Sequence, residues 1–181
     1  MNRLRALEVV SALPGEEAAQ LEFDWVFRSY APYVAAVAHR LLGRDDEVDD
    51  TVQEVFLAAV RGLSQVRDPG AVKAWLARIA VRVARRKLRV RRLRALFGVA
   101  DITDYHDLAD SAASPEERAL LSRVYRALDG LPANQRIAWT LRHIEGERLE
   151  AVAVLSGCSL ATAKRRIQEA SSALEEIFAD E

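Results

Sequence analysis

Apolar side chains recur along this chain at intervals of three and four residues, and this spacing constrains the fold more than any other feature. One clear stripe consists of Val26, Tyr30, Val34, Val37 and Leu41. Such spacing places side chains on one face of an α-helix, whereas a half-buried strand needs strict alternation. Glycine and proline, which interrupt helices, supply only 8 and 5 of the 181 residues. The pattern predicts an all-α protein.

Start and stop signals divide the predicted helices into two groups. The first group covers 22–43, 46–63 and 71–97, and the second covers 115–129, 134–143, 147–155 and 159–178. Between them, residues 98–114 are acidic, rich in small side chains and without a sustained period, which predicts a flexible linker. Pro32 lies inside the first helix, so we expect a break or kink near Ser29–Ala31. The chain is therefore expected to form two small helical modules, at 22–97 and 115–178.

The last two predicted helices form a helix-turn-helix, because a short helix is followed by a glycine-containing turn and then by a long helix. The turn is Ser156-Gly157-Cys158-Ser159. The second helix of such a motif lies in the DNA major groove, with its N-terminal residues near the base edges. The candidate DNA-binding residues on this helix are Ser159, Thr162, Lys164, Arg165 and Arg166.

The net charge of −1 hides a strong segregation of charge along the chain. Residues 69–100 contain ten basic side chains and no acid, whereas residues 16–54 contain ten acids and three arginines. A solvated helix normally mixes charges of both signs, so the basic segment indicates a polyanionic partner, with anionic lipid as the alternative to nucleic acid. The acids near residue 49 also suit a helix N-terminus, and capping alone could explain them. The candidate nucleic-acid contacts in the basic segment are Arg78, Arg82, Arg85, Arg86 and Arg89.

The sequence carries no pattern typical of an enzyme, a metalloprotein or a membrane protein. It has no glycine-rich phosphate loop and no nucleophile elbow, so we expect no catalytic residues. Its three histidines are scattered and lack partners at ligand spacing, so we expect no metal and no cofactor. The single cysteine precludes an internal disulfide, residues 1–21 do not resemble a signal peptide, and no apolar run is long enough to span a bilayer. We therefore expect a soluble cytoplasmic protein without membrane insertion.

Two stretches of the chain carry motifs with a family resemblance. The first is Asp49-Asp50-Thr51-Val52-Gln53-Glu54-Val55-Phe56, followed by Trp75-Leu76-Ala77-Arg78-Ile79-Ala80 and the arginine run. The second is Leu131-Pro132-Ala133-Asn134-Gln135-Arg136, followed by Leu141, Gly146 and Gly157-Cys158-Ser159-Leu160-Ala161-Thr162-Ala163-Lys164. Together they resemble regions 2 and 4 of the extracytoplasmic-function (ECF) sigma factors, which belong to the sigma-70 family. The resemblance spans roughly 22–97 and 115–178, in the order that the family has.

The resemblance implies a division of tasks between a region 2 helical bundle and a region 4 helix-turn-helix. The acidic helix of region 2 would bind core RNA polymerase through Asp49, Asp50, Gln53 and Glu54. The arginine-rich helix would face the melted −10 element of promoter DNA, and region 4 would read the −35 element. An anti-sigma factor is a further expected partner. The implied function is promoter-specific transcription initiation, without catalysis by the chain itself.

The chain departs from the family pattern at four places. Arg82 and Arg86 stand where the family usually has Asn and Asp. Ala151 stands where the family usually has Glu, and Glu169 occupies a usually basic position. The promoter sequence therefore does not follow from the resemblance. Two alternatives stay open: a free-standing helix-turn-helix regulator that binds DNA without polymerase, and a degenerate sigma-like adaptor that titrates an anti-sigma factor.

Overall fold

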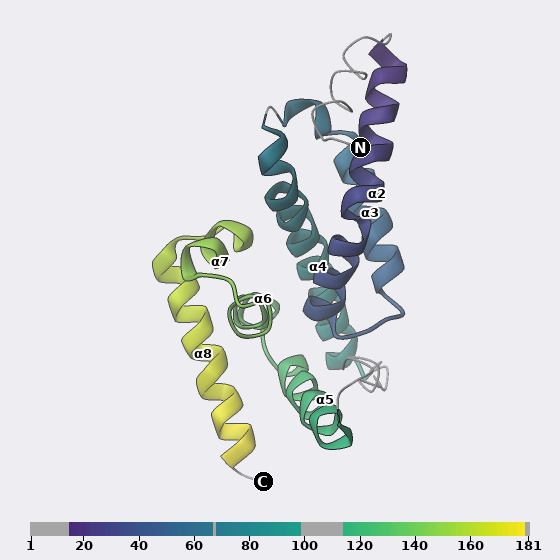
Figure 1. Ribbon diagram of the computed structural model, residues 1–181. Coiled ribbons are helices and arrows are strands. Elements are labelled where there is room, and N and C mark those ends of the chain that lie inside the picture. The colour runs from purple at the N-terminus through teal and green to yellow at the C-terminus, as the bar shows by residue number, and fades with distance from the viewer. Residues whose placement is uncertain (1–14, 67, 99–113, 180–181) are drawn as a thin grey trace.

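The computed structural model describes residues 15–66, 68–98 and 114–179, and every regular element within those ranges is a helix (Figure 1). The predicted all-α fold is therefore confirmed. Residues 99–113 of the predicted linker and residues 1–14 lie outside the described residues. The elements are α2 (Gly15–Leu42), α3 (Val48–Val60), the single 3-10 turns η1 (Leu63–Gln65) and η2 (Pro69–Ala71), α4 (Val72–Leu96), α5 (Pro115–Asp129), α6 (Ala133–His143), α7 (Leu149–Ser156) and α8 (Leu160–Ala179).

Helices α2, α3 and α4 pack against one another in the first half of the chain. Each contributes fully buried side chains to their common core, among them Leu41, Val55 and Leu76. Gly43 ends α2 with a φ of 71°, a left-handed conformation that glycine adopts without strain. Before α4, the Asp68 carboxylate accepts a hydrogen bond from the backbone N–H of Gly70 at 2.8 Å. These turns set the lengths of the helices that carry the acidic and basic segments.

Of the break or kink predicted near Ser29–Ala31, the break is wrong, because α2 continues through Pro32 as one helix. The kink stays a prediction. Proline removes the hydrogen bond to the carbonyl four residues earlier, which here belongs to Arg28. Arg28 is exposed, so water can satisfy that carbonyl. On either side of the proline, Val26 and Val34 are only 2% and 0% exposed. Their burial against the rest of the core stabilises the helical path more than the missing hydrogen bond weakens it.

The second half of the chain begins with a well-capped helix. The Ser114 hydroxyl accepts a hydrogen bond from the Glu117 backbone N–H at 3.1 Å, and the Glu117 carboxylate accepts one from the Ser114 N–H at 2.8 Å. This reciprocal capping box satisfies two amides at the start of α5. Further along, Gly157 joins α7 to α8 with a φ of 63°. The helix-turn-helix that the sequence predicts is therefore present in the fold.

Helix α6 is buried on two sides and joins the two halves of the molecule (Figure 1). One side packs against α7 and α8, and the other packs against α2 and α4. Ile137 and Leu141 of α6 belong to the same apolar cluster as Leu76 and Val83 of α4. A second, smaller cluster around Leu128 holds α5 to α8. The two halves thus share one continuous core.

Candidate polymerase and nucleic-acid interfaces

Four arginines surround one pocket where α4 meets the end of α3 and the end of α7. The pocket has a volume of about 420 Å³, and its lining includes Arg61, Arg78, Arg82, Arg85 and Trp75. No Asp or Glu is among the described residues that line it. Arg61, Arg78 and Arg82 also form no ion pair with any acid of the described residues. Uncompensated positive charge around a hollow attracts polyanions.

The indole of Trp75 forms part of the wall of this pocket. The ring packs against the apolar core but is only half-buried. It also lies very close to Gly62, where a Cβ would stand 2.9 Å from Trp75 Cζ2. Glycine at position 62 therefore leaves room for the ring. Aromatic rings beside cationic side chains are typical of surfaces that bind single-stranded nucleic acid.

Arg85 differs from its neighbours because it contacts the helix-turn-helix. Its guanidinium donates a hydrogen bond to the backbone carbonyl of Ser156 at 2.6 Å. Burial lowers the pKa of Arg85, and the positive charges of Arg166 and Arg89 lower it further. Two candidate DNA-binding arginines, Arg85 from α4 and Arg166 from α8, are therefore brought near each other, although sequence reasoning assigned them to different modules.

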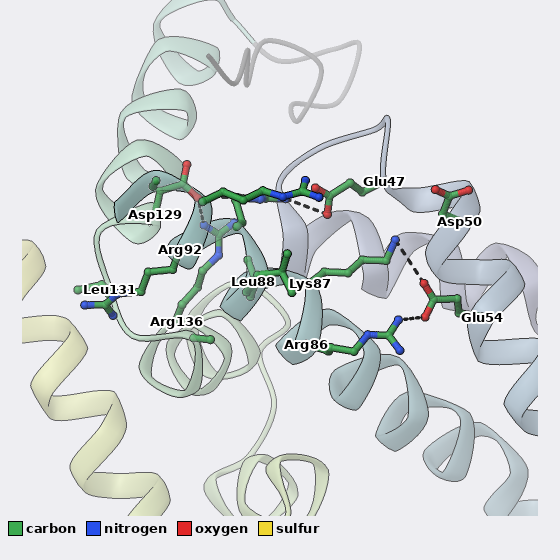
Figure 2. Close-up of a pocket in the computed structure, with 15 residues that line it drawn as sticks. Glu47, Asp50, Glu54, Arg86, Lys87, Leu88, Arg92, Asp129, Leu131 and Arg136 are labelled. Carbon is green, nitrogen blue, oxygen red and sulfur yellow. Dashed lines mark hydrogen bonds and ion pairs between the residues drawn. The ribbon is translucent and has the colours of Figure 1, made fainter. Parts of the chain in front are cut away.

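The acidic side chains predicted to contact polymerase lie on α3. Asp49, Asp50 and Gln53 are exposed, whereas Glu54 is half-buried. Figure 2 shows Arg86 and Lys87 of α4 directed at the Glu54 carboxylate. Arg86 forms a short ion pair with it, and Lys87 Nζ lies 3.6 Å from Glu54 Oε1. The acidic and basic segments, which we expected to face different partners, thus meet at Glu54.

The same acids border a second pocket, of about 480 Å³ (Figure 2). Asp50 and Glu54 lie on its α3 side, and Arg136 of α6 lies on the opposite side. Apolar side chains such as Leu88 and Leu131 line it as well. The pocket therefore lies between the two halves of the chain and mixes charged and apolar walls.

The start of α8 is organised by Ser159. Its hydroxyl accepts a hydrogen bond from the Thr162 backbone N–H at 3.2 Å and lies 2.9 Å from the Thr162 hydroxyl. This cap satisfies an amide at the helix start, as a serine at this position does. Lys164 and Arg165 are exposed, and Arg166 is half-buried. The first turns of α8 therefore present cationic side chains beside a capped helix end.

Glu169, which stands at a usually basic position of the motif, has two partners. Arg165 Nη1 lies 3.6 Å from one of its carboxylate oxygens. The Gln135 amide of α6 donates a hydrogen bond to the other at 2.8 Å. Glu169 thus links the recognition helix to α6 and offsets part of the charge of Arg165.

Sequence reasoning missed Arg91 and Arg136, which make the most extensive polar contacts between the halves of the chain. In the sequence, Arg91 is one more member of the arginine run, and Arg136 is part of a motif. Arg136 is 1% exposed, the most buried charged side chain among the described residues. A single arginine within a predicted helix carries no signal that distinguishes a buried residue from a solvated one.

Family comparisons decide between the possible classes of protein. The chain matches the family model for sigma-70 region 2 over residues 26–94 and the model for sigma-70 region 4 over residues 121–174. It is also 31% identical over 165 residues to the ECF RNA polymerase sigma-E factor of Escherichia coli, with 86% of each chain covered. This chain belongs to the ECF sigma factors. It is therefore a non-enzymatic transcription initiation factor of RNA polymerase.

Other relatives of this sigma factor agree with that assignment. The ECF RNA polymerase sigma factor SigE of Mycolicibacterium smegmatis is 31% identical over 173 residues, which cover 91% of this chain and 65% of the relative. Two solved structures share the fold. The sigma factor RpoE of Bartonella quintana, in complex with the anti-sigma factor NepR, has a TM-score of 0.64 at 24% identity, covering 87% of this chain and 97% of that one. CnrH, in complex with the cytosolic domain of CnrY, has a TM-score of 0.60 at 23% identity, covering 99% of this chain and 97% of that one.

The described part of this sigma factor also bears on the membrane and metal predictions. None of its described helices is both long enough and apolar enough to cross a bilayer. Within the same residues, no three His, Cys, Asp or Glu side chains gather in a group that could hold a metal ion.

Proposed function

We propose that this sigma factor binds core RNA polymerase through α3 and promoter DNA through α4 and α8. The polymerase contacts are Asp49, Asp50, Gln53 and Glu54. The DNA contacts are Arg78, Arg82, Arg85, Arg86 and Arg89 of α4 and Ser159, Thr162, Lys164, Arg165 and Arg166 of α8. The observation that carries the proposal is the pocket lined by Trp75 and four arginines without an acid.

The chemistry of that pocket supports contact with the melted strand in particular. Arginines bind backbone phosphates whatever the sequence, and an aromatic ring beside them can stack on an unpaired base. The capped start of α8 supports contact with duplex DNA, because a helix with cationic side chains in its first turns suits the major groove. The exposed carboxylates of Asp49 and Asp50 support a basic protein partner.

The proposal also covers the residue bounds of the two regions, the inhibitory partner and the location in the cell. Region 2 occupies 22–97, region 4 occupies 115–178, and 98–114 links them. An anti-sigma factor is the expected inhibitory partner, since both structural relatives named above were solved with a second protein. The cytoplasm is the expected location, because that is where promoter DNA and RNA polymerase meet.

The proposal is tested by mixing the chain with core RNA polymerase. We expect co-elution on gel filtration at low salt and run-off transcripts from a subset of a promoter panel. Asp49→Arg should weaken core binding. Glu175→Arg is the matched control, because it makes the same charge change on an exposed position of α8. Equal loss in both variants would show that only net charge matters and would refute the α3 assignment.

Two outcomes would favour the other functional classes. Tight binding of a duplex operator by the free chain, without polymerase, would favour a free-standing regulator. Binding of core polymerase or of an anti-sigma factor without any transcript would favour an adaptor. Neither alternative accounts for both the arginine-lined pocket and the exposed acids of α3.

A further inference from the structure

Two polar atoms of residues that line the arginine-lined pocket are buried without a hydrogen-bond partner. They are Nε of Arg85 and Oγ of Ser156. Ser156 is only 2% exposed, and its backbone carbonyl accepts a hydrogen bond from Arg85 Nη2 at 2.6 Å. That contact leaves the Nε–H and the serine hydroxyl unused. A buried polar group without a partner costs free energy, and a ligand that accepts hydrogen bonds in the pocket would remove that cost.

Positive charge is concentrated on one side of the same pocket. Arg78, Arg82 and Arg85 are spaced by four and three residues along α4, so their side chains share one face of the helix. Arg61 joins them from the end of α3. The pKa of Arg85 is lowered first by burial and then by nearby arginines, which shows how closely the charges are crowded. A ligand with several negative charges would relieve this repulsion.

Other side chains of the pocket suit a planar group. The half-buried indole of Trp75 is part of the wall, and an unpaired base can stack on such a ring. Gln65 also lines the pocket, and its exposed side-chain amide forms no hydrogen bond with the described residues. An amide offers both donors and an acceptor, as the edge of a base requires. The pocket thus combines groups for phosphates with groups for a base.

The size and the walls of the pocket favour a small ligand. Its volume of about 420 Å³ lies within the usual range for small-molecule pockets, about 300–1,000 Å³. Leu155, Ser156 and Gly157 of α7 and its turn close one side, so a ligand that ends inside the pocket fits without moving them. The pocket of about 480 Å³ is a poorer site for a polyphosphate, because acids such as Glu54 and Asp129 line it beside the cations.

We propose that the arginine-lined pocket binds a free nucleoside di- or triphosphate. Arg61, Arg78 and Arg82 would hold the phosphates, and the base would lie against Trp75 beside Gln65. The inference rests on the proposed function only for its consequence: a promoter strand would contact the same arginines, so a bound nucleotide and the promoter exclude each other. The concentration of free nucleotide would then regulate this sigma factor. The binding itself requires neither polymerase nor promoter.

The binding is tested by isothermal titration calorimetry of the full chain with ATP, GTP and inorganic tripolyphosphate. Divalent cations are left out, because they would mask the phosphates. We expect saturable binding of one nucleotide per chain. Tripolyphosphate should bind about tenfold more weakly, because it has no base to stack on the indole. No saturable binding of either nucleotide up to about 1 mM would overturn the inference, and so would equal affinity for tripolyphosphate.

Arginine variants test which cations hold the phosphates. Arg78→Ala and Arg82→Ala should each weaken nucleotide binding about tenfold, because each removes charge-assisted hydrogen bonds. Arg28→Ala is the matched control, since it removes the same charge from an exposed position of α2 that does not line the pocket. It should leave the affinity unchanged. An equal loss in all three variants would show an effect of net charge alone and would overturn the site.

Two variants test the place of the base. Trp75→Leu should abolish the preference for nucleotide over tripolyphosphate, and circular dichroism shows whether this variant is folded. Gln65→Ala changes an exposed side chain and does not risk the fold. It should weaken nucleotide binding several-fold and leave tripolyphosphate binding unchanged, because only the base would contact the amide. If Gln65→Ala changed neither affinity, the base would not lie beside it and the assignment to a nucleotide would fail.

Competition with a labelled 12-nucleotide single-stranded DNA links the ligand to the DNA-binding role. In fluorescence anisotropy, nucleotide should displace the strand at the concentrations that saturate the calorimetric titration. A strand that bound but was not displaced would overturn the shared pocket and leave the proposed function in place. A chain that bound nucleotide in this pattern but gave no run-off transcripts would refute the proposed function and leave the nucleotide site in place.

Discussion

The salt dependence of promoter binding should separate the arginines of α4 from one another. Arg78 and Arg82 form no ion pair with an acid of the described residues, whereas Arg86 is paired with Glu54. A cation that neutralises one phosphate of a single strand steepens the plot of log K against log salt by about 0.7. Arg78→Ala or Arg82→Ala should therefore make the slope shallower by about 0.7 each. Arg86→Ala should reduce it less, because this guanidinium must first leave Glu54.

The size of the effect follows from the same relation. Between 50 and 250 mM KCl, a slope change of about 0.7 alters the relative affinity about threefold. The assay is fluorescence anisotropy of a labelled promoter fragment titrated with the complex of the chain and core polymerase. Lys73→Ala serves as a control, since Lys73 lies over the Tyr33 ring, 4.5 Å from its centre, and is not among the pocket residues. A slope that stays the same in the Arg78 and Arg82 variants would refute the assignment of this pocket to DNA.

Three further predictions concern region 4 and its contacts. Tyr125→Phe removes one hydrogen bond between the halves and should lower the free energy of unfolding by about 1 kcal/mol in urea denaturation. An unchanged free energy would mean that this hydrogen bond contributes nothing to stability. Gly157→Ala should lower the free energy of unfolding by about 1 kcal/mol in the same assay, because the left-handed φ is strained for alanine. Nothing lies within 4 Å of the added Cβ, so a loss above about 3 kcal/mol would reveal a clash instead. Arg165→Ala should weaken promoter binding less than Lys164→Ala does, because Glu169 already offsets part of its charge; the reverse order in the anisotropy assay would contradict that.

The helices themselves could be predicted from local sequence because their signals are local. Gly43, the Asp68-Pro69-Gly70 turn and the Ser114 cap all act within a few residues, and all behave as their chemistry predicts. Pro32 was the exception. Its local effect on the helix is outweighed by the burial of Val26 and Val34, which only tertiary packing reveals. Trp75 lies on the apolar stripe of α4, which predicts a core position, but its ring is only half-buried beside Gly62.

The contacts between the halves could not be predicted, because they join residues between 38 and 105 positions apart. Arg40 and Glu145 belong to segments with no shared pattern, and each looks like an ordinary surface charge in sequence. The arginine run also contains two kinds of residue that sequence cannot separate. Arg78 is exposed at the pocket, whereas Arg91 is held by Glu47, Asp129 and the end of α2. Charge counts along a chain do not reveal which charges a fold has already paired.

The burial of α6 on two sides bears on how the regions behave when they are separated. A fragment covering 115–178 would carry Ile137 and Leu141 without the α4 side chains that share their cluster. A fragment covering 22–97 would lose the apolar side chains of α6 and Arg136, which donates a hydrogen bond to the last carbonyl of α2. Each piece would expose an apolar strip of the kind that drives self-association. Polar substitutions on those strips, chosen from the contacts between α4 and α6, are the natural route to fragments that stay monomeric at the concentrations needed for NMR.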